Sequence, residues 1–202
     1  MKNMFKDAGI LLVITLVSGL LLGLVYQITK DPIAIQKEKA KQEACMEVFA
    51  DAAEFEELEV TNPNAAFWAE AGFSQESVDE VMAALDNSGN TLGYVITVTT
   101  KEGYGGDIQF SIGVRLDGTV NGMSILSISE TPGLGMKAGD VLVPQFADKK
   151  VEKFEYTKSG AASDNQIDAI SGATITTNAV TNGVNAGLYY FQTKLEGGSA
   201  NE

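Results

Sequence analysis

The chain has 202 residues, and 27 acidic against 14 basic side chains give it a formal net charge of −13. This acidic balance argues against nucleic-acid binding, which needs a basic surface. Histidine is absent and Cys45 is the single cysteine. Histidine-based catalysis, histidine metal ligation, an internal disulfide and an iron–sulfur cluster held by this chain's cysteines alone are therefore excluded. We expect no metal site, and any redox chemistry must come from a bound organic cofactor.

An apolar segment follows a short N-terminal tail, residues 1–7. Residues 8–29 carry no charged side chain, and about 20 such residues span the hydrocarbon core of a bilayer. A cleavable signal peptide has a shorter apolar region followed by a small-x-small cleavage site, and the sequence around Tyr26-Gln27-Ile28 contains none. The segment is therefore predicted to be an uncleaved transmembrane anchor. Its Gly19 and Gly23 have the Gly-x-x-x-Gly spacing that permits close contact between membrane helices.

Charges on the two sides of this anchor favour a cytoplasmic position for the rest of the chain. Two lysines and the amino terminus precede it, whereas four lysines follow it between residues 30 and 41. The positive-inside rule weakens, however, when a long domain follows. Charge alone therefore leaves the orientation open.

A helix is predicted after the anchor, because Asp31-Pro32 has the residue types of an N-cap followed by proline at the first helical position. Residues 30–53 are expected to form a helical stalk, in which Cys45 is a small buried residue. Residues 54–194 are expected to form one globular domain. Residues 195–202 are expected to be a disordered tail.

The globular domain combines predicted helix and sheet. A short helix is expected from Ser74 to about Asp86. Residues 92–100 are rich in β-branched side chains and predict a strand. Residues 107–115 and 120–127 predict two more strands, joined by the hairpin turn Leu116-Asp117-Gly118-Thr119. The fold class is therefore α+β, with an antiparallel sheet.

A hydroxyl-rich segment begins the last predicted helix. Gly172 and Ala173 allow close backbone approach, and apolar residues then recur every four positions at Val180, Val184 and Leu188. The free amides and the dipole at the start of a helix favour an anion such as phosphate. The hydroxyl side chains at this position are Ser171, Thr174, Thr176 and Thr177. The alternative is that these side chains are only N-caps.

Two glycine-containing motifs follow predicted strands. They are Gly103-Tyr104-Gly105-Gly106 and Glu130-Thr131-Pro132-Gly133-Leu134-Gly135. Glycines let backbone amides reach a flat ligand, and Tyr104 or Leu134 could cover a ring; taken alone, each motif is more simply a tight turn. Residues 133–139 are one residue too long for G-x-G-x-x-G and follow a proline, so a Rossmann site for NAD is rejected.

Asp168-Ala169-Ile170-Ser171-Gly172-Ala173-Thr174 resembles the acceptor site of proteins that carry FMN through a phosphoester bond to threonine. In that family, Asp is followed by two free positions, Ser or Thr, and Gly-Ala-Thr, and all fixed positions are present here. With the anchor and the two glycine motifs, the chain resembles the G subunit of the Rnf-type ion-translocating electron-transport complex. The C subunit of Na⁺-translocating NADH:quinone reductase is the alternative, although it is usually longer.

The resemblance implies roles for individual residues. Thr174 would carry covalent FMN, and Asp168 would serve either recognition by the FAD:protein FMN transferase or capping of the local turn. The phosphate would be held by Ser171, Gly172, Ala173 and the amides near Thr176 and Thr177. The isoalloxazine ring would contact Tyr104, Glu130, Thr131, Gly133 and Leu134. No residue is expected to be catalytic by itself.

The resemblance also implies partners and location. The chain would relay electrons between carriers in a membrane-bound complex that couples ferredoxin and NAD⁺ to Na⁺ or H⁺ transport. It would cross the inner cell membrane once, with the flavin domain outside the cytoplasm. A stand-alone extracytoplasmic FMN protein and a purely structural domain with unmodified Thr174 remain alternatives. A pilin-type surface protein is disfavoured, because the Gly-Phe-type processing site is absent.

Overall fold

The computed structural model describes residues 2–60 and 65–196 of the chain. These belong to two compact units, Met1–Ala40 and Lys41–Glu202, which are described separately. Residues 197–202 of the predicted tail lie outside the described residues. Leu195, the first residue of that predicted tail, is instead buried at the end of a helical turn.

The first unit consists of helix α1, which spans Lys2–Val48 and continues into the second unit. By length and composition, this is the one helix among the described residues that could cross a membrane, and its most apolar window of 18 residues has a mean hydropathy of 2.6. The predicted start of a separate helix at Asp31-Pro32 is wrong, because Pro32 lies inside α1. Proline removes one backbone N–H from the ladder, and the helix continues on both sides of it.

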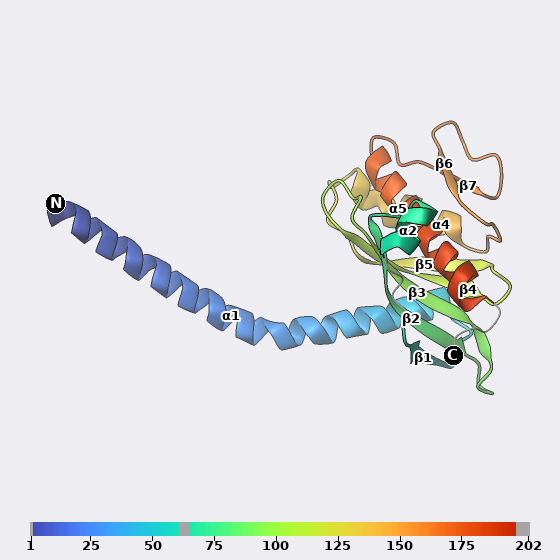
Figure 1. Cartoon of the computed structure of the whole chain (residues 1–202), viewed down its shortest axis with the longest axis horizontal. Helices are drawn as coiled ribbons and strands as arrows, with labels where there is room; N and C mark the ends of the chain where they lie inside the picture. Colours follow the sequence, from blue (N-terminus) through green and yellow to red (C-terminus); the bar gives the residue numbers. More distant parts are fainter. Residues whose placement is uncertain (1, 61–64, 197–202) are drawn as a thin grey trace. The chain divides into compact units, whose positions relative to one another are not determined.

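The second unit is built on a five-stranded antiparallel sheet with the strand order β1-β2-β3-β4-β5 (Figure 1). The strands are β1 Glu54–Leu58, β2 Glu76–Leu85, β3 Thr91–Thr100, β4 Ile108–Arg115 and β5 Val120–Ser127. The three predicted strands are confirmed as β3, β4 and β5. Gly118 has φ +84° in the turn between β4 and β5, as the predicted hairpin requires. The sheet and its helices confirm the α+β fold class.

The predicted short helix from Ser74 is wrong, because this segment forms strand β2. Its register with β3 shifts between Val78 and Glu80, which is a β-bulge. The bulge places buried Val78 and Val81 three residues apart instead of two. That spacing imitates helical periodicity, and Glu, Met and Ala are good helix formers. Pairing with β3 therefore outweighs the local preference of this segment.

Helix α5, Thr174–Tyr190, covers one face of the sheet (Figure 1). Its buried Val180, Val184 and Leu188 belong to one core with alternate residues of the central strands. Gly187 is required for this close packing, because a Cβ added there would lie 2.5 Å from Ile112 Cδ1. The predicted helical periodicity of this segment is thus confirmed, and the helix begins at Thr174.

The other face of the sheet is covered by the end of α1 and the residue that follows it. Cys45, Val48 and Phe49 pack with Ala84 and Val95 in a second apolar cluster. Ala84 and Val95 lie on β2 and β3, and Val95 points to the opposite side of its strand from the α5 face. Lys41 adds an ion pair of 2.8 Å to Glu80 on β2. Residues 41–49 of the predicted stalk are therefore part of the globular unit, and Cys45 is buried as expected.

The remaining elements are short. Helix α2, Ala65–Ala71, carries Trp68, which is buried in the main core. Between β5 and α5 lie η1 Gly135–Lys137, α3 Ala138–Val141, α4 Val143–Phe146 and a parallel pair of strands, β6 Glu155–Thr157 and β7 Gln166–Asp168. The chain after α5 continues in η2, Phe191–Leu195. The connection from β5 to α5 thus brings the end of β5 and the start of α5 to a common edge, where the site lies.

Candidate functional site

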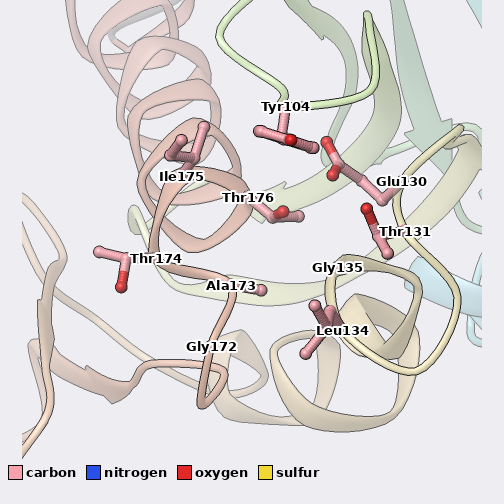
Figure 2. Close-up of a pocket in the computed structure, with 10 residues that line it drawn as sticks. All are labelled: Tyr104, Glu130, Thr131, Leu134, Gly135, Gly172, Ala173, Thr174, Ile175 and Thr176. Atoms are coloured by element: carbon pink, nitrogen blue, oxygen red, sulfur yellow. The ribbon is translucent and has the colours of Figure 1, made fainter.

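A cavity of about 510 Å³ lies at the N-terminal end of α5 (Figure 2). This volume lies within the range typical of cofactor and ligand sites. Its walls come from the loop between β3 and β4, the loop after β5, and the segment that begins α5. The lining residues are Tyr104, Glu130, Thr131, Leu134, Gly135, Gly172, Ala173, Thr174, Ile175 and Thr176. All three sequence motifs singled out above therefore contribute to one cavity.

The first turn of α5 has free backbone amides. Ala173 occupies the N-cap position, and within the described residues no side chain caps this end of the helix. The interpretation of the hydroxyl residues as N-caps is therefore wrong. The N–H groups of Thr174, Ile175 and Thr176 have no acceptor within the helix, as in any first helical turn. Together with the helix dipole, they make this end of the cavity suited to an anion.

The three threonines of this turn have different surroundings. Thr177 is fully buried, and its hydroxyl donates to the carbonyl of Ala173 at 2.9 Å and accepts from the N–H of Ile170 at 3.1 Å. Thr176 is only 2% exposed. Thr174 is partly exposed, and Figure 2 shows its side chain directed away from Thr176 and Glu130. Of these three threonines, Thr174 is the one that is not buried, and it lines the cavity.

Gly172 shapes the turn that leads into α5. Its φ is +79°, a backbone conformation that other residues rarely adopt. A Cβ at this position would also lie 3.2 Å from Leu134 Cδ2, so the turn and the side chain of Leu134 are in close contact. The backbone conformation and the close contact with Leu134 therefore explain why the first position of the Gly-Ala-Thr pattern is glycine in this chain.

Glu130 joins two walls of the cavity. It is 6% exposed, and its Oε1 accepts the N–H of Gly105 at 3.2 Å. Gly135 lies against the same side chain, because an added Cβ would come within 2.7 Å of Glu130 Cβ and 2.5 Å of Thr176 Oγ1. The loop after β5, the Tyr104 loop and the start of α5 are thus packed together through Glu130 and Gly135.

Large apolar side chains surround the cavity on its exposed side. Tyr104 is 71% exposed and Ile175 is 53% exposed, and Leu134 is also exposed. A cluster of exposed apolar side chains next to a cavity is typical of a ligand or partner site. The cavity therefore combines an anion site at the helix end with apolar side chains suited to a flat ring.

Four predicted site residues do not line the cavity. Ser171 is exposed beside it, Thr177 turns its hydroxyl into the local turn, and Gly133 (φ +77°) shapes the loop that presents Leu134. Asp168 is exposed at the end of β7, where its Oδ1 accepts the N–H of Ala161 at 2.7 Å. This hydrogen bond joins the end of β7 to the loop that precedes it.

Two lining residues were not among the predicted contacts. Gly135 ends the second glycine motif, whose spacing already marked it as a position of close approach. Ile175 directly follows Thr174, and its exposed apolar side chain in the first turn of a helix was the signal that could have identified it.

Comparison with known families agrees with this geometry. A family described as FMN-binding domain matches residues 103–189, which contain every residue that lines the cavity. A second family, described as RnfG N-terminal region, matches residues 1–48. The crystal structure of Shewanella oneidensis NqrC has a similar fold, with a TM-score of 0.51, 19% sequence identity, and coverage of 73% of this chain and 84% of that chain.

Curated relatives match over nearly their whole length. The chain is 34% identical to the G subunit of the Na(+)-translocating ferredoxin:NAD(+) oxidoreductase complex of Acetobacterium woodii, covering 95% of this chain and 93% of that protein. It is 34% identical to the proton-translocating counterpart of Clostridium ljungdahlii, with 91% and 89% coverage. It is 32% identical to the G subunit of the ion-translocating oxidoreductase complex of Methanosarcina acetivorans, with 94% and 95% coverage. These matches confirm the resemblance drawn from the motifs: the chain belongs to the family of G subunits of ion-translocating ferredoxin:NAD(+) oxidoreductase complexes.

Proposed function

We propose that this chain carries FMN on the Oγ1 of Thr174 and relays electrons through it within a membrane-bound ion-translocating ferredoxin:NAD⁺ oxidoreductase complex. The observation that carries the proposal is the partly exposed Thr174 at an uncapped helix N-terminus, where it lines a cavity with apolar walls. The names of the relatives support the membership in a complex with other subunits.

The residues present fit FMN at both of its ends. The free amides of Thr174, Ile175 and Thr176 would hold the phosphate, because they point out of the helix end and carry its positive partial charge. Tyr104 and Leu134 would cover the ring, since both are large, apolar and exposed at the cavity. Glu130 would present its carboxylate to polar groups at the ring edge. FMN supplies the electron-transfer chemistry, and the protein supplies position and exclusion of water.

Attachment of the cofactor requires a second protein. We propose that an FAD:protein FMN transferase joins the Thr174 oxygen to the FMN phosphorus of FAD. The P–O–P bond of FAD breaks, AMP leaves, and the hydroxyl proton is released, so the product is FMN minus water on threonine. Asp168 and Ser171 are exposed on the same segment as Thr174 and would be available to that enzyme.

Intact mass and peptide mapping test the attachment. Full-length protein expressed with the transferase should gain the mass of one FMN minus water, localised to Thr174. Thr174→Val should abolish the gain, whereas the matched control Thr176→Val should keep it. Modification of another residue in wild type, or an unmodified protein while the transferase modifies a second substrate, would overturn the proposal.

We further propose that α1 anchors the chain in the cell membrane with the flavin domain outside the cytoplasm. The long apolar part of α1 supports the anchoring, and the orientation rests on the family resemblance. Lys158→Cys would place a thiol on an exposed loop, while the native Cys45 is buried. A membrane-impermeant thiol reagent should label this variant in intact cells. Labelling that appears only after lysis would show the opposite orientation.

A further inference from the structure

The loop that carries Tyr104 is anchored by carboxylates at two points. On one side, Glu130 Oε1 accepts the N–H of Gly105 at 3.2 Å. On the other side, Glu102 Oε2 accepts hydrogen bonds from Asn178 Nδ2 at 3.1 Å and from Asn182 Nδ2 at 2.7 Å. Tyr104 lies between these two anchors in the sequence.

The second anchor joins the loop to α5. Asn178 and Asn182 are four residues apart, so their side chains lie on the same face of the helix, one turn from each other. Both amides converge on one oxygen of a charged acceptor, and hydrogen bonds to charged groups are stronger than neutral ones. Glu102 and both asparagines are half-buried, which shields these bonds from competition with water.

The backbone around Glu102 has little freedom to rearrange. Its N–H donates to Thr100 Oγ1 at 3.3 Å, and that buried hydroxyl donates to Glu76 Oε1 at 3.2 Å. At Gly103, an added Cβ would lie 2.2 Å from the carbonyl oxygen of Gly106 and 2.9 Å from Glu130 Oε1. The loop is therefore tightly folded between its anchors.

Tyr104 itself is 71% exposed, so packing of its own side chain contributes little to its position. Its ring lies at the cavity (Figure 2), and the residues on both sides of it, Glu102 and Gly105, are held by hydrogen bonds. Glu130 also lines the cavity, but Glu102 does not, and Glu102 acts only through the loop and α5.

We infer that Glu102, held by Asn178 and Asn182, is the positioning residue that fixes Tyr104 against the flavin ring. This inference rests on the proposed binding of FMN in the cavity. A tyrosine in contact with a flavin quenches its fluorescence by electron transfer in the excited state. Flavin fluorescence is therefore a readout that a purely structural role of Glu102 elsewhere in the domain would not move.

The test uses full-length protein loaded with FMN by the transferase, with equal FMN content verified by mass. Tyr104→Leu should raise flavin fluorescence several-fold, and Glu102→Ala should raise it by a similar factor. The Tyr104→Leu/Glu102→Ala variant should not exceed Tyr104→Leu alone. Glu102→Gln should stay near wild type, because its amide oxygen can still accept from both asparagines.

Two further variants test whether a rise in flavin fluorescence comes from a general loss of structure. Asn182→Ala removes only the shorter of the two hydrogen bonds and should give an intermediate increase. Asp79→Ala is the matched control, because Asp79 is an exposed carboxylate that accepts from Thr99 and Gln109 at the same end of the sheet. It lies outside the cavity, and its loss should leave flavin fluorescence unchanged.

The outcomes separate the inference from the proposed function. If wild type carries no FMN, both fail. If FMN is attached and Tyr104→Leu raises the fluorescence while Glu102→Ala does not, the positioning role is overturned and the attachment stands. The same conclusion follows if Tyr104→Leu has no effect, or if Glu102→Ala raises the fluorescence further in the absence of Tyr104.

Discussion

The contact between α5 and the sheet gives a prediction with a magnitude, for the variant Gly187→Ala. The added Cβ would lie 2.5 Å from Ile112 Cδ1 and 3.2 Å from Val98 Cγ2, in the buried core. Overpacking of this kind costs about 1–3 kcal/mol. Alanine recovers up to about 1 kcal/mol of helix propensity relative to glycine. Because the two effects oppose each other, we expect the free energy of unfolding to fall by about 0–2 kcal/mol, with a central value of roughly 1 kcal/mol.

A second substitution identifies the atom responsible. Ile112→Val removes Cδ1, the atom nearest to the added Cβ, and alone costs about 0.5–1.5 kcal/mol. In the Gly187→Ala/Ile112→Val variant the closest contact is gone. The sum of the losses in unfolding free energy of the two single variants should therefore exceed the loss in the double variant, by on the order of 1 kcal/mol.

Urea unfolding of the full-length protein in detergent micelles measures these values. Trp68 is the single tryptophan and is buried in the main core, so its fluorescence reports the folding of the globular unit. Gly139→Ala is the control, because Gly139 lies in a helix and an added Cβ there meets no atom within 4 Å. Strictly additive losses in the double variant would refute the close packing described here.

Two further predictions concern buried polar groups. Burial raises the pKa of Glu76, and the charge of Glu102 raises it further. The stability that this carboxyl contributes is thus fully present below its ordinary pKa of 4.5 and is lost as the pH rises through the raised value. The unfolding free energy of wild type relative to Glu76→Gln should accordingly decrease from acidic to neutral pH in urea titrations, and a pH-independent difference would contradict the raised pKa. Thr97 Oγ1 and Ser111 Oγ form a buried hydrogen bond of 2.9 Å. Thr97→Val should cost about 1–3 kcal/mol by leaving the serine without its partner, and Thr97→Val/Ser111→Ala should cost less in the same assay; a larger loss in the double variant would argue against this pairing.

The elements that sequence patterns predicted correctly are those decided by local chemistry. Asp117-Gly118 has the turn residues that join β4 and β5, and the four-residue spacing of apolar side chains in α5 is a local signal. The identity of β2 depended instead on its pairing with β3 and on the bulge at Val78. The end of α1 was assigned to a solvated stalk because its burial depends on residues far away in the sequence, such as Val95.

Most of the residues predicted from the motifs to contact the cofactor, including Tyr104 and Leu134, line one cavity, because their loops meet at the start of α5. The residue types alone did not show which of Thr174 and Thr176 would carry the cofactor, because both are threonines at the start of the same helix. The structure does separate them by exposure, because the direction of each side chain depends on where the helix begins. The same start of the helix turns Thr177 into the local turn and leaves Ser171 outside the cavity.

Because residues 41–49 pack on the sheet, they limit where a shortened recombinant form of the chain can begin. A recombinant fragment that begins at Glu54 would lack Cys45, Val48 and Phe49, and would leave Ala84 and Val95 bare to water. Uncovered apolar surface of this kind promotes aggregation. A soluble fragment for crystallisation or electrochemistry should therefore start no later than Lys41, which retains both the ion pair to Glu80 and the apolar cover of the sheet.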